Sequence, residues 1–132
     1  MLALLAVGIG ATPISIAAPQ SKLLDPAVPA EGKYTVTVKG GTYDLLTFVV
    51  DFAPGAGIPK HYHGGHVLGT VLTGELTLQE KNGSRTVKAG QSFTEQPGAI
   101  HAVVNMSKTT TRIIASEPIP KGAEETTLVK IT

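Results

Sequence analysis

The feature of this sequence that most limits its fold is a rhythm of short β-branched runs, each ended by Gly or Pro within a few residues. Val, Ile and Thr favour strands, and Gly and Pro end them. No segment keeps the 3.6-residue apolar period of a helix. We therefore predict an all-β domain of about ten short strands, arranged as a sandwich or barrel. Besides the segment that holds His61 and His63, the expected strands cover residues 34–38, 45–52, 67–72, 75–80, 85–88, 92–96, 101–105, 111–116 and 126–131.

Composition removes several classes of function. The 132 residues are enough for one domain, and a hydrophobic share of 42% is enough for one core. Eleven basic and ten acidic residues give a net charge of +1 without a basic block, so we expect no nucleic-acid partner. The chain has no cysteine, which excludes disulfides, thiolate metal sites and a cysteine nucleophile. A metal site would have to use the four histidines and the carboxylates.

The beginning of the chain differs from the rest, because residues 1–21 contain no charged side chain. The apolar run at residues 2–9 is too short to span a membrane, and small residues follow at the two positions that a signal peptidase reads. We interpret residues 1–17 as a signal peptide, which would make the protein secreted or periplasmic. The alternative is an ordinary N-terminal segment of a cytoplasmic protein. Residues 18–32 would then form an arm or linker, and residues 33–132 the β-domain.

Three of the four histidines lie close together in the sequence, at His61, His63 and His66. Side chains of a strand alternate between its two faces, so His61 and His63 project to the same face and can share a metal ion. His101 begins a later expected strand. A His-x-His pair alone is weak evidence, because solvated loop histidines would look the same.

The spacing of glycines around these histidines is more specific. Residues 57–74, with the sequence Gly-Ile-Pro-Lys-His-Tyr-His-Gly-Gly-His-Val-Leu-Gly-Thr-Val-Leu-Thr-Gly, resemble the first motif of the cupin superfamily. Residues 90–105 resemble the second cupin motif, with Gly90, Gly98, His101 and Asn105 in register and the proline displaced to position 97. The two motifs occur in the expected order, and the resemblance covers about residues 40–116.

This resemblance implies a cupin-type β-barrel or jelly roll over residues 33–132, with antiparallel strands. It implies metal ligation by His61, His63 and His101. Val67 stands where the family carries its metal-binding Glu, so the resemblance implies a three-histidine site without a carboxylate. The implied cofactor is one divalent transition metal, either Fe, Mn, Ni, Cu or Zn, all of which accept imidazole.

Two further residues are candidates for a role in the site. Glu95 lies in the expected strand that precedes His101. If its side chain faces inward, it is a candidate general acid or base, or an outer partner of a ligand. His66 is a candidate fourth ligand or a residue at the mouth of the pocket.

Three-histidine cupins resemble dioxygenases, and isomerases and lyases also occur in the superfamily. We therefore expect a metal-dependent, dioxygenase-like oxidoreductase that acts on an oxygen-bearing small molecule. The alternatives are a non-catalytic protein that binds a small ligand, and a structural barrel with a vestigial metal site. Unpaired sheet edges with few charges to guard them predict a homodimer.

Overall fold

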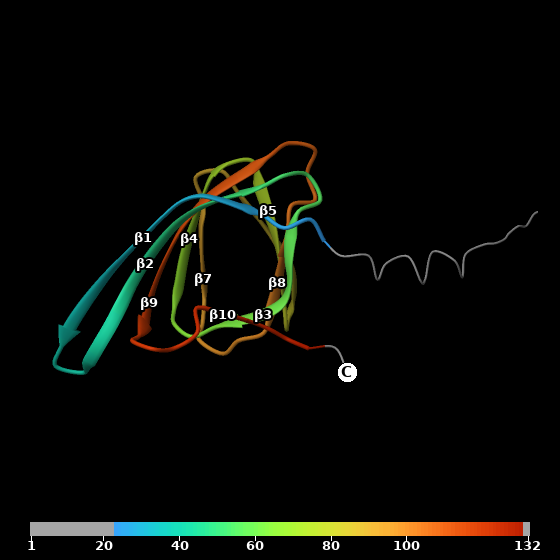
Figure 1. Ribbon diagram of the computed structural model, residues 1–132. Coiled ribbons are helices and arrows are strands. Elements are labelled where there is room, and N and C mark those ends of the chain that lie inside the picture. The colour runs from blue at the N-terminus through green and yellow to red at the C-terminus, as the bar shows by residue number, and fades with distance from the viewer. Residues whose placement is uncertain (1–22, 131–132) are drawn as a thin grey trace, which may run out of the picture.

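The computed structural model describes residues 23–130, which form two antiparallel sheets of five strands each (Figure 1). The predicted all-β jelly roll is confirmed, with ten strands in this part of the chain. The strands are β1 (Ala27–Val38), β2 (Gly41–Phe52), β3 (Gly57–His63), β4 (Val67–Thr73), β5 (Glu75–Glu80), β6 (Gly83–Lys88), β7 (Ser92–Glu95), β8 (His101–Val104), β9 (Thr111–Pro120) and β10 (Thr126–Leu128).

The two sheets are stacked face to face and enclose the core. One sheet has the strand order β1-β2-β9-β4-β7, and the other has the order β10-β3-β8-β5-β6. Alternation along β9 shows how the sequence builds this arrangement, because Thr111, Ile113 and Ala115 are buried while Arg112 and Ile114 between them are exposed. The inner faces of both sheets contribute the largest apolar side chains of the core, including Phe52, Leu76, Leu78 and Phe93.

A tight turn joins β5 to β6, as the Asn-Gly pair at residues 82–83 predicts. Glu80 pairs with Gly83, so the two turn residues are Lys81 and Asn82. Gly83 follows them with a φ of 122°, a conformation that side-chain-bearing residues rarely adopt. The turn sets the register that buries Leu76 and Leu78 on one face.

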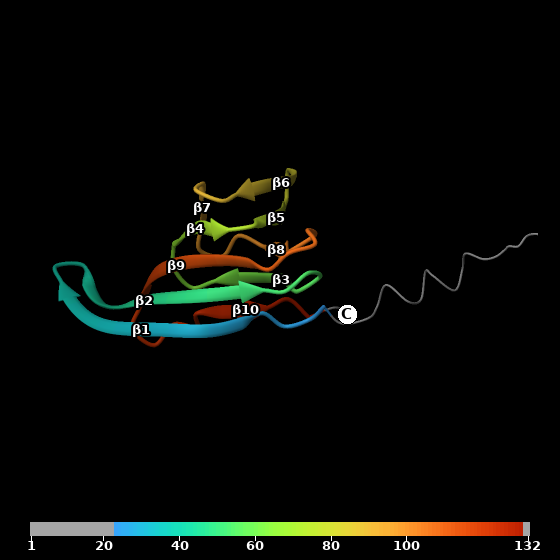
Figure 2. The ribbon, with the colours of Figure 1, turned by 90° about the horizontal axis from the view of Figure 1, so that it is seen from above.

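The first strand begins earlier than the sequence indicates. The arm expected over residues 18–32 contributes its last part to β1, which starts at Ala27 and pairs with β2 along most of its length. Pro29 is tolerated because β1 is an edge strand, where a missing N–H costs no ladder hydrogen bond, and the register shifts between Ala27 and Ala30. The β1–β2 hairpin extends beyond the other strands at its turn end (Figure 2).

No helix in residues 23–130 has the length and apolarity needed to cross a membrane. The signal peptide predicted for residues 1–17 lies outside the described residues.

Candidate metal centre

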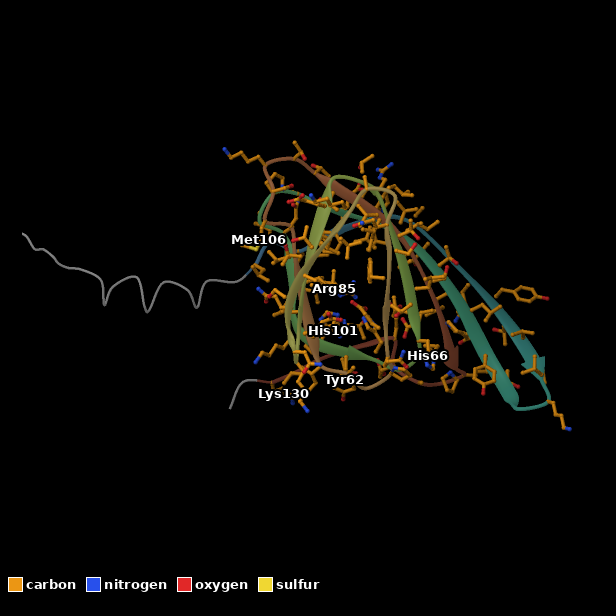
Figure 3. The ribbon with its side chains drawn as sticks, turned by 180° about the vertical axis from the view of Figure 1, so that it is seen from behind. Tyr62, His66, Arg85, His101, Met106 and Lys130 are labelled. Carbon is orange, nitrogen blue, oxygen red and sulfur yellow. The ribbon has the colours of Figure 1, made fainter. Side chains whose placement is uncertain are left out.

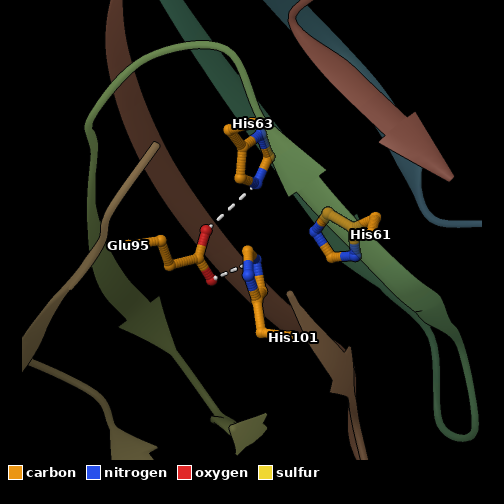
Figure 4. Close-up of side chains that lie close together, drawn as sticks. All are labelled: His61, His63, Glu95 and His101. Atoms are coloured by element: carbon orange, nitrogen blue, oxygen red, sulfur yellow. Dashed lines mark ion pairs between the residues drawn. The ribbon is translucent and has the colours of Figure 1, made fainter. Parts of the chain in front are cut away.

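Three histidines and one glutamate meet between the two sheets (Figure 4). His61 and His63 project from β3, and His101 begins β8 as the direct register partner of His61. Glu95 ends β7, which belongs to the opposite sheet. One ligand atom from each of the four residues lies within 4.8 Å of the others. The centroids of the three imidazole rings are 4.2 to 5.2 Å apart.

The orientation of each imidazole is fixed by its Nδ1 atom. Nδ1 of His61 lies 2.8 Å from the carbonyl oxygen of Pro59, and Nδ1 of His101 lies 2.8 Å from that of Ala99. Nδ1 of His63 lies 3.1 Å from the carbonyl oxygen of Glu125. A carbonyl oxygen only accepts, so each Nδ1 carries the proton and donates it. In the neutral rings the Nε2 atoms are therefore left with free lone pairs, as metal-binding histidines require.

Glu95 places its carboxylate directly against two of these lone pairs. Its Oε2 atom lies 3.1 Å from Nε2 of His63, and its Oε1 atom lies 3.1 Å from Nε2 of His101. Carboxylate oxygens and unprotonated imidazole nitrogens are all acceptors, so this arrangement is repulsive unless a cation or a proton lies between them. Glu95 Oε1 and His101 Nε2 are indeed buried without a hydrogen-bond partner among the described residues. The donor set therefore fits a divalent transition metal held by three imidazole nitrogens and one carboxylate.

The protonation of the metal-free cluster follows from the same geometry. Burial lowers the pKa of His61 to about 4, so that imidazole stays neutral at physiological pH. Burial also opposes a charge on His63, but the carboxylates of Glu95 and Glu117 outweigh it and raise the pKa of His63. Burial opposes the charge on Glu95 as well, and the adjacent imidazoles of His101 and His63 outweigh it, lowering the pKa of Glu95 to about 2. Without metal, the raised pKa of His63 favours a proton between His63 and Glu95, and metal binding must compete with that proton.

Val67 lies directly beside the carboxylate that β7 contributes. Val67 is buried, with 5% of its surface exposed, and it is the cross-strand partner of Glu95 on the inner face of the β4–β7 pair. Position 67, where the resemblance implies a glutamate, and Glu95 are thus direct cross-strand neighbours. The cluster has a charged fourth member, in contrast to the neutral three-histidine site that the sequence predicts.

His66 is not brought to the cluster. It lies on the turn between β3 and β4 and is exposed, whereas His101 is buried between the sheets (Figure 3). The two glycines before it place its side chain outside, and Val67 takes the inward position. The side chain of Glu95 faces inward, which is the orientation that a role in the site requires.

Sequence reasoning missed a second buried carboxylate, Glu117 on β9. Its Oε1 atom accepts a hydrogen bond of 3.1 Å from the backbone N–H of Gly65, and its Oε2 atom lies 3.7 Å from Nδ1 of His63. Burial raises the pKa of Glu117 to about 7. The alternation of Thr111, Ile113 and Ala115 continues to Glu117 and marks this side chain as inward.

Two hollows reach the cluster from different directions. A wide groove of about 800 Å³, lined largely by polar residues of β5, β7 and the β7–β8 turn, ends at Glu95 and His101. A smaller cavity of about 160 Å³ lies between the sheets and reaches His61, His63 and Glu95. Its walls are apolar side chains from both inner faces, including Phe48, Phe52, Ile58, Phe93, Val103 and Ile113.

The fold and the cluster agree with comparisons to known proteins. A family model described as "Cupin domain" matches residues 48–117, which is more than half of the chain and includes all four cluster residues. The chain belongs to the cupin family. No curated protein matches it.

Solved structures with the same fold include a conserved protein with a double-stranded β-helix domain from Klebsiella pneumoniae. It has 24% identity and a TM-score of 0.56, over 83% of this cupin and 92% of that chain. A cupin domain from Bordetella pertussis has 24% identity and a TM-score of 0.52, and the match covers 74% of this cupin and 97% of that chain. An oxalate oxidase bound to the substrate analogue glycolate has 27% identity and a TM-score of 0.58. That match covers 76% of this cupin but only 54% of the oxidase chain.

Proposed function

We propose that this cupin is a metal-dependent, dioxygenase-like enzyme that acts on an oxygen-bearing small molecule. The proposal is carried by one observation, the inward-facing set of three imidazoles and one carboxylate, in which Glu95 Oε1 and His101 Nε2 are buried without a hydrogen-bond partner among the described residues. A divalent metal bound there would supply a Lewis acid with room for an oxygen ligand from the substrate. The oxalate oxidase neighbour supports oxygen chemistry on this fold, without indicating the substrate.

The residues of this chain would have distinct roles. Nε2 of His61, His63 and His101 and the carboxylate of Glu95 would hold the metal, and the backbone carbonyls behind the imidazoles fix the ring orientations. Glu95 would cancel one of the two positive charges. The buried carboxyl of Glu117, with its raised pKa, can hold a proton close to His63 near neutral pH. The apolar walls beside the cluster would keep water from one side of a metal bound there.

Elemental analysis of protein purified without chelator tests the metal site. We expect one transition-metal ion per chain, and loss of this ion in a His61→Ala/His101→Ala variant that keeps its β-sheet circular dichroism. Surface His66→Ala is the matched control, because it removes an imidazole without touching the cluster. A metal content no higher in the parent than in the double variant would contradict the proposal and favour a vestigial site.

Catalysis is separated from ligand binding by oxygen consumption. A dioxygenase inserts both atoms of O₂ into its organic substrate and needs no external reductant, so turnover consumes one O₂ per substrate. Metal-dependent binding of a small molecule without oxygen uptake would instead favour the non-catalytic alternative.

Export is tested by mass spectrometry of the protein from its native source, where we expect a chain that starts near residue 18.

A further inference from the structure

The carboxylate of Glu117 occupies an inward position on a strand whose other inward positions are apolar or hydroxyl-bearing. Thr111, Ile113 and Ala115 precede it on the same face of β9, and Glu117 itself is 1% exposed. Burying a carboxylate is costly unless a positive charge or several hydrogen-bond donors lie beside it. Among the described residues, the ion pair that Glu117 makes is with His63, which belongs to the candidate metal centre.

One oxygen of Glu117 supports the turn between β3 and β4. Oε1 accepts a hydrogen bond of 3.1 Å from the backbone N–H of Gly65. The turn lies directly on β9, since a Cβ atom at Gly65 would collide with the carbonyl oxygen of Pro118. A glutamine could accept the same hydrogen bond without carrying a charge. Support of the turn therefore does not account for a carboxylate at this position.

The other oxygen faces the metal centre from behind. Oε2 has no hydrogen-bond partner among the described residues and lies 3.7 Å from Nδ1 of His63. On the opposite side of the same ring, Nε2 of His63 lies 3.1 Å from the carboxylate of Glu95 (Figure 4). His63 thus stands between two buried carboxylates, whereas Nδ1 of His61 and Nδ1 of His101 meet backbone carbonyls. The imidazole of His63 therefore connects Glu117 to the proposed metal.

The charge of the proposed metal makes use of this connection. A divalent ion held by three neutral imidazoles and Glu95 leaves one positive charge without a counter-ion in a buried site. We propose that Glu117 is a positioning residue that acts through His63, and that its carboxylate is the second counter-charge of the metal. Both carboxylates together make the centre neutral, so it holds a divalent cation more tightly, and an added anion less tightly, than it would without Glu117. This inference rests on the proposed function.

Glu117→Gln separates the charge of the side chain from its shape. The amide keeps the length of the side chain and an acceptor for the N–H of Gly65, and it removes the negative charge. Glu124→Gln is the matched control, because it removes the same charge from an exposed residue. If Glu117→Gln does not fold, Glu117→Met serves in its place, since methionine is also unbranched and carries no charge.

Two titrations at pH 8 measure the effect. Competition with a chelator gives the affinity for zinc, and we expect Glu117→Gln to bind zinc about tenfold more weakly than the parent. Addition of azide at full cobalt(II) occupancy, followed through the visible absorption of cobalt, gives the affinity of the metal for an anion. We expect Glu117→Gln to bind azide about fivefold more tightly than the parent, because its metal centre keeps one more positive charge. Glu124→Gln should match the parent in both titrations.

The two expected changes have opposite signs, which a purely structural role would not produce. Weaker zinc binding without tighter azide binding would indicate damage to the turn or to the ring of His63, and it would overturn the inference. Zinc and azide affinities equal to those of the parent would also overturn it, while leaving the metal site in place. If the parent binds no zinc, cobalt or other transition metal, the proposed function itself fails, and the inference fails with it.

Discussion

The pairing of Val67 with Glu95 predicts that the carboxylate of the site can be moved from one strand to its neighbour. Both residues face inward, and cross-strand partners have Cβ atoms about 5 Å apart. Glu95→Ala should weaken metal binding, and adding Val67→Glu should restore it by supplying a carboxylate from β4. Val67→Glu alone should lower the stability of the metal-free protein, because it buries a second carboxylate beside Glu95.

The size of the effect follows from linkage. A metal ion at 100 times its dissociation constant stabilises the folded state by about 2.7 kcal/mol. For a domain of about a hundred residues this raises Tm by about 10 °C. Loss of an outer partner of a metal ligand already costs up to about 100-fold in affinity, so loss of Glu95 should cost at least as much. At the same metal concentration, Glu95→Ala should then gain about 2 °C or less. A double variant restored to within tenfold of the parent would gain about 6 °C.

Thermal melts with and without Mn(II), followed by circular dichroism, measure these differences directly. The control is Glu95→Ala combined with Leu68→Glu, which adds a carboxylate to the outer face of the same strand, where Leu68 is 53% exposed. Equal metal-induced shifts for the Val67→Glu and Leu68→Glu double variants would show that residue 67 does not reach the cluster. If metal raised the Tm of the Glu95→Ala variant as much as that of the parent, Glu95 would not be a ligand.

Three other predictions concern residues around the site and the surface. Folding raises the pKa of Glu117 from 4.5 to about 7, so its contribution to stability is present below pH 4.5 and is lost as the pH rises through 7. Metal-free Glu117→Gln should therefore melt with the parent at pH 4.5 and be more stable than the parent at pH 8, and equal stability of the two proteins at pH 8 would contradict this. His66→Ala should leave metal affinity within twofold of the parent, and a larger loss measured by competition with a chelator would return His66 to the site. The outer face of the β1-β2-β9-β4-β7 sheet exposes Tyr34 and Leu45, which we expect to lie in a homodimer interface. Light scattering at micromolar concentration should give the mass of a dimer for the parent and of a monomer for the Tyr34→Lys/Leu45→Lys variant. A monomeric parent would refute this.

The sequence was sufficient to predict the fold, because strand periodicity and breakers act locally. Leu76 and Leu78 are buried as their alternation indicates, and the His-x-His spacing places two imidazoles on one face of β3. The partnership of Glu95 with Val67 is different, since it depends on the register between β4 and β7. That register is set by long-range pairing, which spacing along the chain does not encode.

The contrast between local sequence patterns and long-range strand pairing also explains where the predicted strand boundaries differ from the structure. Glu117 was missed because the expected strand stopped at residue 116, although β9 continues to Pro120. Residues 27–32 looked like a linker because of Pro29 and the preceding Pro26, yet an edge strand accepts proline where its N–H would face solvent. In both cases the chain obeys a local rule, and only the neighbouring strand decides how far the element extends.

The attachment of His63 has a consequence for the kinetics of the site. Pro59 and Ala99 orient His61 and His101 from within their own strand or the turn just before it, but His63 is held by Glu125 and Thr126, at the start of the three-residue strand β10. Short terminal strands separate from a sheet more readily than central ones. Each such excursion would release one imidazole and widen the opening that Glu125 and Thr126 help to line. Metal exchange and ligand entry would then share one gate, and their rates should rise together when the pairing of β10 is weakened.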